Sequence, residues 1–248
     1  MRWLGTSFKM TKTRAEAAAY AARLREAVGD GLEGVCPFVI PSATAIATVT
    51  DALGGRDSPV LVGAQNTHWA DEGAWTGEIS VPQAADAGAR IIEIGHSERR
   101  AHFGESDATV RLKTRAVLRH GLAPLVCVGE SEETRAAGGG TDAVLAQAAA
   151  ALDGLQNPTD VLIAYEPVWA IGEHGRAPRP EEIAPVLAEL SDLPVKGVLY
   201  GGSVSEGNAA ELLRLPGVDG LFVGRAAWDA EAYVRLLATV ARHARAVA

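Results

Sequence analysis

The chain has few cysteines and few aromatic residues, and it lacks a long apolar run. Of its 248 residues, two are Cys and 5% are aromatic, although 48% are hydrophobic. This composition indicates a core of Ala, Val, Leu and Ile. Cys36 and Cys127 stand in apolar runs without a partner at the spacing of a metal site, which favours buried free thiols in a reducing compartment over a disulfide framework. Eighteen apolar residues never occur in succession, so no membrane-spanning helix is expected.

Positive charge is also scarce. The formal net charge is −8 at pH 7, which argues against nucleic acid or an anionic membrane as a partner. An anionic ligand would therefore have to be bound by local features. Because no long apolar segment follows a basic stretch at the N-terminus, we expect a soluble cytoplasmic protein.

Short apolar runs alternate with Ala-rich stretches along the whole chain. The apolar runs are typical of buried parallel strands, and they cover residues 2–8, 35–40, 59–65, 90–94, 123–128, 160–165, 195–200 and 218–223. The stretches with helical composition cover residues 13–28, 43–53, 81–87, 106–120, 141–155, 180–190, 206–215 and 227–246. Eight β-then-α units without a linker predict a single α/β domain, a (β/α)8 barrel over residues 1–248. An open doubly wound sheet is the alternative, but no Gly-rich dinucleotide-binding turn follows the first strand.

The segment around Glu166 suggests a general base under a lid. Glu166 ends the sixth predicted strand, and Pro167 stops that strand. Residues 168–171 are apolar and too short for a helix, and Gly172 and Gly175 give this segment freedom to move. A carboxylate beneath a water-excluding flap is suited to proton abstraction, although an isolated Glu in this place would more often be a solvated strand cap.

Other polar residues follow the remaining predicted strands. Lys9 ends the first strand, and His96 and Glu98 follow the fourth. Since parallel barrel strands end at one rim, these side chains are expected to meet near Glu166. Each of them alone has an ordinary structural explanation, as a counter-ion or a packed histidine. The remaining histidines are too scattered to predict a metal site.

Two Gly-rich turns would complete the rim as a phosphate site. One contains Ser203 and follows the seventh strand; the other contains Gly224 and Arg225 and follows the eighth. Glycines let backbone N–H groups approach a phosphate, and we expect helices beginning after Ser203 and after Arg225 to direct their positive ends at it.

These residues occur in segments that resemble triosephosphate isomerases over nearly the whole length of the chain. The matching segments are Phe-Lys-Met at 8–10, Gly-Ala-Gln-Asn at 63–66, Ala-Trp-Thr-Gly-Glu at 74–78, Gly-His-Ser-Glu-Arg-Arg at 95–100, Cys-Val-Gly-Glu at 127–130, Ala-Tyr-Glu-Pro-Val-Trp-Ala-Ile-Gly at 164–172 and Tyr-Gly-Gly-Ser at 200–203.

The resemblance implies an enzyme that interconverts a ketose phosphate and an aldose phosphate through an enediolate, without a metal or another cofactor. Glu166 would be the base, a neutral His96 the electrophile, and Lys9 the group that stabilises the oxyanion. A short helix beginning near Ser97 would keep the imidazole neutral. Glu98 would orient Lys9, with an ion pair to the adjacent arginines as the alternative.

The resemblance also implies a phosphate site and a partner. Gly172, Ser203 and Gly224 would bind the phosphate, and closure of the lid would protect the enediolate from water. The loop from Asn66 to Ser80 would insert into a second subunit, so a homodimer is expected.

Departures from the family pattern affect the expected substrate. Ser7 replaces the usual Asn two residues before Lys9, which widens the pocket, and Arg225 replaces the second glycine of the last turn. Residues 173–177 and Phe222 also depart from the pattern. The first expectation is triosephosphate isomerase activity, on dihydroxyacetone phosphate and glyceraldehyde 3-phosphate, in glycolysis and gluconeogenesis. One alternative is a four-carbon erythrulose phosphate isomerase of erythritol breakdown, because the chain also resembles a side branch of the family with that activity. The other is a barrel that binds sugar phosphates without turnover.

Overall fold

A computed structural model describes residues 1–171 and 175–246 of the chain. Its centre is a closed barrel of eight parallel strands that pair in sequence order. They are β1 (Arg2–Ser7), β2 (Val35–Ile40), β3 (Leu61–Ala64), β4 (Ile91–Ile94), β5 (Ala123–Val128), β6 (Leu162–Tyr165), β7 (Gly197–Tyr200) and β8 (Gly220–Val223). Pairing of β1 with both β2 and β8 closes the barrel. The predicted barrel fold is confirmed.

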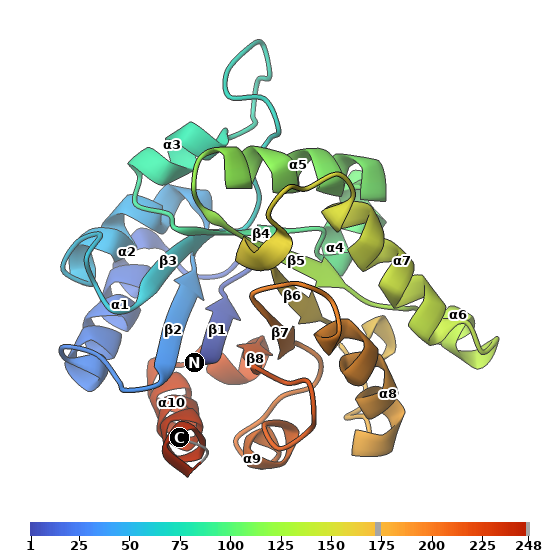
Figure 1. The fold of residues 1–248 in the computed structure, drawn as a ribbon. Coiled ribbons are helices and arrows are strands. Elements are labelled where there is room, and N and C mark those ends of the chain that lie inside the picture. The colour runs from blue at the N-terminus through green and yellow to red at the C-terminus, as the bar shows by residue number, and fades with distance from the viewer. Residues whose placement is uncertain (172–174, 247–248) are drawn as a thin grey trace.

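Helices surround the barrel, as Figure 1 shows in a view along its axis. The α-helices of the described residues are α1 (Arg14–Val28), α2 (Ile46–Ala52), α3 (Val81–Asp86), α4 (Ser97–Phe103), α5 (Asp107–Arg119), α6 (Glu132–Ala136), α7 (Gly140–Leu152), α8 (Pro180–Ser191), α9 (Ala209–Leu212) and α10 (Ala230–Ala246). Short 3₁₀ turns are η1 (Ala43–Ala45), η2 (Pro158–Asp160), η3 (Val168–Ala170) and η4 (Arg225–Ala227). Not one of these helices has the length and hydropathy that a bilayer span requires.

The two faces of each strand enter different cores. Residues such as Leu4, Ile92 and Val126 pack outward against the helices. Phe38 and Phe222 point into the barrel, where their rings stack with centroids 5.8 Å apart. Because side chains alternate along a strand, every second side chain of each strand points into the barrel and helps to fill its interior.

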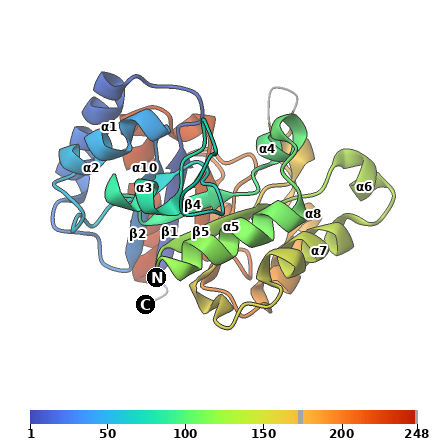
Figure 2. The same ribbon diagram turned by 90° about the horizontal axis from the view of Figure 1, so that it is seen from above.

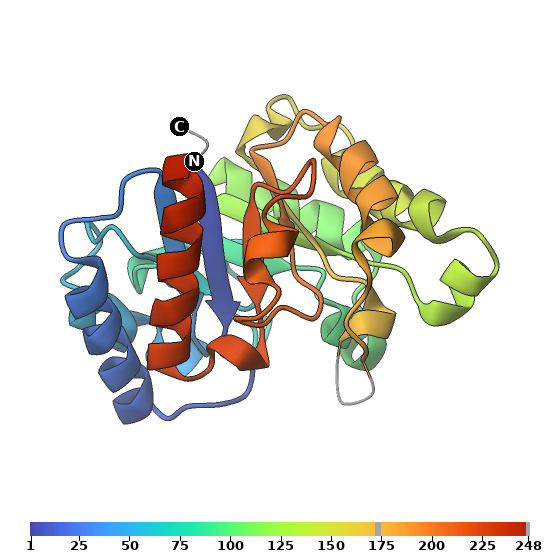
Figure 3. The ribbon, with the colours of Figure 1, turned by 90° about the horizontal axis from the view of Figure 1, so that it is seen from below.

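The ends of the barrel are distinct. The N-terminus and the end of α10 lie at one end of the barrel, and β1 runs from there beside α10 toward the opposite end (Figure 3). Helix α4, which directly follows β4, lies at that opposite end (Figure 2). The loops that follow the strands therefore gather away from the termini, on the face where barrel enzymes carry their active sites.

Several predicted helices differ from the structure in their bounds. The predicted helix at 206–215 contracts to α9, because Asn208 accepts a hydrogen bond from the Ser205 amide and donates one to the Ser203 carbonyl, which holds this segment as a turn. The helix expected at 43–53 is divided between η1 and α2, and the helix expected from residue 227 begins only at Ala230.

Candidate active site

A cleft of about 670 Å³ opens where the strands end. It is lined by loops after β1, β4, β6, β7 and β8, which are far apart in sequence. The predicted site residues that line it are Ser7, Lys9, His96, Glu98, Glu166, Ser203, Gly224 and Arg225. Gly172, the other predicted site residue, lies outside the described residues.

Glu166 is held at the mouth of the barrel by close backbone packing. Its amide donates to the Val128 carbonyl at 2.8 Å, which continues the β5–β6 pairing beyond β6. A Cβ atom on Gly201 would lie 2.7 Å from Cγ of Glu166, so only glycine leaves room for this side chain. Glu166 is 5% exposed. Burial, assisted by the nearby Glu93 carboxylate, raises the pKa of Glu166 well above its usual range.

His96 caps helix α4 with its own imidazole. Nδ1 accepts the Glu98 backbone N–H at 3.1 Å, so the neutral ring carries its proton on Nε2. Burial, followed by the charge of Lys9, lowers the pKa of His96 to about 4. The side chain thus offers a neutral N–H donor to the cleft at physiological pH.

The two groups face each other directly. Nε2 of His96 lies 3.4 Å from Oε2 of Glu166, and that oxygen accepts no hydrogen bond from the described residues. A carboxylate without a fixed donor can accept a proton from a carbon acid.

Lys9 follows β1 in a left-handed backbone conformation, with φ 49°, which is uncommon for a residue other than glycine. Gln65 holds this conformation, because its Nε2 donates to the Lys9 carbonyl at 2.9 Å. Nζ of Lys9 lies 2.6 Å from Oε1 of Glu98. The alternative partners of Glu98 are engaged elsewhere, since Arg99 pairs with Glu105 and Arg100 pairs with Asp107.

The two Gly-rich turns adjoin the same cleft, but without the expected long helices. Helix α9 begins only at Ala209, and η4 begins at Arg225 itself. The prediction that helices begin directly after Ser203 and after Arg225 is therefore wrong. What remains at the cleft is the polar backbone of both turns, the hydroxyl of Ser203 and the exposed guanidinium of Arg225.

The described part of the predicted lid is anchored to the barrel. Residues 168–170 form η3, and Trp169 is buried, with Nε1 donating to Glu130 at 2.7 Å. Arg176 lies over the Trp169 ring, 4.6 Å from its centroid, and contacts Glu182 at 2.7 Å with two nitrogens. This pair attaches the far side of the lid segment to the start of α8.

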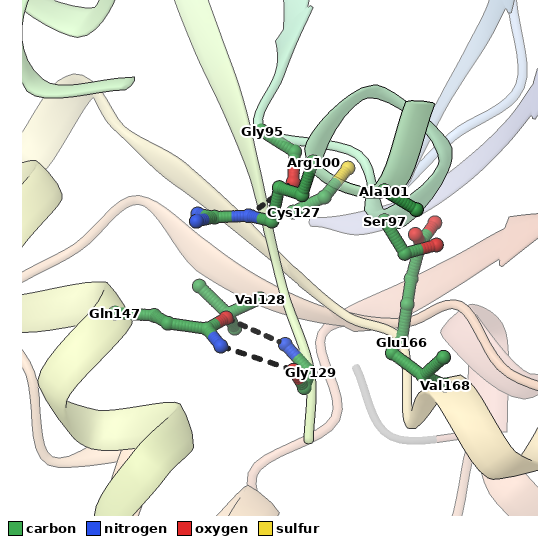
Figure 4. A pocket seen from close by; sticks show the side chains of 10 residues that line it. All are labelled: Gly95, Ser97, Arg100, Ala101, Cys127, Val128, Gly129, Gln147, Glu166 and Val168. Atoms are coloured by element: carbon green, nitrogen blue, oxygen red, sulfur yellow. Dashed lines mark hydrogen bonds between the residues drawn. The ribbon is translucent and has the colours of Figure 1, made fainter. Parts of the chain in front are cut away.

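A second cavity of about 300 Å³ also borders Glu166 (Figure 4). Its lining includes Ser97, Cys127, Gly129 and Glu166. Glu166 consequently separates two spaces. Burial, followed by the adjacent carboxylates, raises the pKa of the Cys127 thiol, in agreement with a packing role. Cys36, which was also expected to be buried, is only half-buried.

Two polar residues of this region were not predicted. Glu93 is buried in β4 and accepts a hydrogen bond from Ser7, and Glu130 accepts from both Tyr165 and Trp169. A signal for Glu93 existed, because it is the one charged residue in the apolar run Ile-Ile-Glu-Ile at 91–94.

Comparisons with known proteins decide the family. The family model described as triosephosphate isomerase matches residues 2–240. The chain belongs to the triosephosphate isomerase family. A solved triosephosphate isomerase from Bartonella henselae superposes with a TM-score of 0.84 at 32% identity, covering 96% of this chain and 98% of that one.

Members of this family with other names are also similar. An L-erythrulose-1-phosphate isomerase from Mycolicibacterium smegmatis is 55% identical over 99% of this chain and 95% of its own length. Another protein with that name, from Mesorhizobium japonicum, is 48% identical over 95% of each chain. The chain is thus an isomerase of the triosephosphate isomerase family, of the aldose–ketose class, and it acts on a phosphorylated sugar.

Proposed function

We propose that this enzyme isomerises L-erythrulose 1-phosphate. The observation that carries the proposal is the opposition of His96 and Glu166 beside Lys9 in one cleft. The choice of a four-carbon substrate is supported by the similarity to relatives named for that reaction, and by the short Ser7 beside the reacting groups. Dihydroxyacetone phosphate, the substrate expected first from the sequence, is the second candidate. It is supported by the similarity to the Bartonella triosephosphate isomerase.

The proposed mechanism moves the carbonyl by one carbon. Glu166 removes the proton from C3, and the C–H electrons form the C2–C3 double bond of an enediolate. The Nε2–H of His96 and the ammonium of Lys9 stabilise the negative charge on the two oxygens. A proton then passes between these oxygens, and Glu166 returns its proton to C2, which leaves the carbonyl at C3.

The size of the substrate decides the product. With four carbons, the new carbonyl is internal, and the product is again a ketose phosphate, erythrulose 4-phosphate when numbered from the other end. With three carbons, the same steps end in an aldehyde. One Glu serves both proton transfers because the two carbons are adjacent.

Phosphate recognition is assigned to the two Gly-rich turns and to Gly172 of the lid segment. The backbone amides of Gly172 and Gly224, the hydroxyl of Ser203 and the guanidinium of Arg225 bind the phosphate in this proposal. Arg225 supplies a local positive charge to a chain whose net charge is −8. Arg225 lines the cleft, and its guanidinium is suited to bind a phosphate.

The proposal includes a homodimer in the cytoplasm. The loop between β3 and α3 extends beyond the ring of helices (Figure 1). Trp75 on this loop is 50% exposed, although its ring centroid lies 4.3 Å from that of His68. An exposed aromatic on a projecting loop is suited to burial in a partner. The free thiols Cys36 and Cys127 support a reducing compartment.

One assay tests the substrate. The kcat/KM values are compared on L-erythrulose 1-phosphate, D-erythrulose 4-phosphate and dihydroxyacetone phosphate. We expect the first two to exceed the third at least tenfold. A preference for dihydroxyacetone phosphate would reverse the choice of substrate, and a folded protein inactive on all three would contradict the mechanism.

A further inference from the structure

A buried carboxylate beneath the cleft contacts no substrate in the mechanism described so far. Glu93 lies on β4, where Ile92 and Ile94 point outward to the helices. Its side chain therefore points into the barrel interior, the same side as Ile91. Glu93 is 3% exposed, and it is not among the residues that line the cleft.

Ser7 connects this carboxylate to the cleft. It ends β1 and is 3% exposed, yet it lines the cleft beside Lys9 and His96. Its Oγ donates to Oε2 of Glu93 at 2.8 Å. Since β1 and β4 are not neighbours in the barrel, this bond spans the interior rather than joining adjacent strands. The Ser7 backbone is fixed as well, because Nε1 of Trp228 donates to its carbonyl at 3.0 Å.

The bond determines what Ser7 can offer to a substrate. A serine has one O–H, and here it is used by Glu93, so only the Oγ lone pairs remain for the cleft. Lone pairs repel the negative oxygens of an enediolate, which are served instead by Lys9 and His96. The complementary ligand group is a neutral hydroxyl that donates a hydrogen bond.

We propose that Ser7, oriented by Glu93, is the subsite for the terminal hydroxymethyl group of a four-carbon sugar phosphate. This inference rests on the proposed function, and it identifies the contact that separates four carbons from three. The short side chain of Ser7 leaves space for the added carbon, and its Oγ accepts the added hydroxyl. Glu93 is a positioning residue, because it acts through Ser7 without touching the substrate.

The test is a double-mutant cycle read as selectivity. Selectivity is the kcat/KM on L-erythrulose 1-phosphate divided by the kcat/KM on dihydroxyacetone phosphate. We expect Ser7→Ala to lower it about tenfold, which corresponds to about 1.4 kcal/mol. Glu93→Leu, which frees the Ser7 hydroxyl, should lower it by at least threefold. In the Ser7→Ala background, Glu93→Leu should change it less than twofold, because the residue through which it acts is gone.

A neighbouring variant provides the control. Thr6→Val removes a buried hydroxyl one residue away that does not line the cleft, and it should leave the selectivity unchanged. Selectivity within twofold of wild type in Ser7→Ala would overturn the subsite. An equal loss from Glu93→Leu with and without Ser7 would overturn the positioning role. A loss that is equal for both substrates would indicate a structural effect only, and would also overturn the inference.

A binding experiment separates this inference from the proposed function. In a Glu166→Gln background, which removes the base, the dissociation constants of L-erythrulose 1-phosphate and dihydroxyacetone phosphate are measured by calorimetry. We expect Ser7→Ala to weaken the four-carbon ligand at least fivefold more than the three-carbon ligand. An equal effect would refute the subsite even if the wild-type enzyme turns over L-erythrulose 1-phosphate. Absence of that turnover, with the differential binding intact, would refute only the proposed reaction.

Discussion

Oε2 of Glu166 and Nε2 of His96 lie 3.4 Å apart without a hydrogen bond between them. The two groups come from β6 and from the start of α4, and their pKa values move in opposite directions, upward for the carboxyl and downward for the imidazole. Burial is the main cause of both shifts, because a low-dielectric site disfavours the charged form of either group. The result is a strong base facing a neutral donor.

The tautomer of His96 can be observed directly. Because Nδ1 accepts the Glu98 amide, we expect the ¹⁵N shifts of the labelled ring to report a neutral imidazole with its proton on Nε2. The ring should remain neutral from pH 8 down to pH 5 and should take up a proton only near its pKa of about 4. A titration midpoint near that of an exposed histidine, about 6.5, would contradict this description.

Shortening the base should affect chemistry more than binding. Glu166→Asp withdraws the carboxylate by about one methylene, and a displacement of about 1 Å can lower a rate about a hundredfold. We expect kcat to fall by that factor or more. The inhibition constant of inorganic phosphate should change little, because the proposed phosphate contacts lie on other segments than Glu166. Near-normal kcat would remove Glu166 from its role.

Gly201 should be required for the position of Glu166. In Gly201→Ala, the added Cβ would lie 2.7 Å from Cγ of Glu166, so the side chain must move, and we expect kcat to fall at least tenfold. Gly207→Ala is the matched control, since its Cβ would meet its nearest atom, Oγ of Ser205, at 3.8 Å. Equal kinetics in the two variants would show that this packing does not hold the base.

The sequence predicted the barrel because local pattern and global topology agree. Each strand is a short apolar run, and each run is followed by a helical stretch, so the order of the elements determines the fold. The strands are shorter than predicted where apolar residues extend beyond the pairing. In β3, for example, pairing starts at Leu61 although the run begins at residue 59.

A site residue could be predicted only where its place at the end of a strand determines its position in the fold. The places of Lys9, His96 and Glu166 follow from the parallel strands. The bond between Glu93 and Ser7 could not be predicted, because these residues are separated by 86 residues along the chain and by the barrel interior in space. The positions of the helices after Ser203 and Arg225 depended on local side-chain bonds, such as those of Asn208, which compete with helix formation.

The proposed dimer predicts a measurable change of mass. Trp75→Glu places a charge on an exposed position of the loop after β3, and burying an unpaired charge is unfavourable. By light scattering after size exclusion, we expect the wild type at twice the chain mass and the variant at or near the chain mass. Phe103→Glu is the control, because Phe103 is also exposed but lies on α4, outside the loop. A monomeric wild type would contradict the dimer.

Finally, Glu93 should make stability depend on pH. Burial raises the pKa of Glu93 from 4.5 to about 7, so the folded protein binds this proton more tightly than the unfolded chain does. The stabilisation by that proton is complete below pH 4.5 and is lost as pH rises through 7. Relative to Glu93→Leu, the wild type should lose about 3 kcal/mol of unfolding free energy across this window. Urea titrations of both proteins at several pH values measure the difference, and Thr6→Val, which removes no titratable group, should follow the wild type. A constant difference between wild type and Glu93→Leu would mean that burial does not raise the pKa of Glu93.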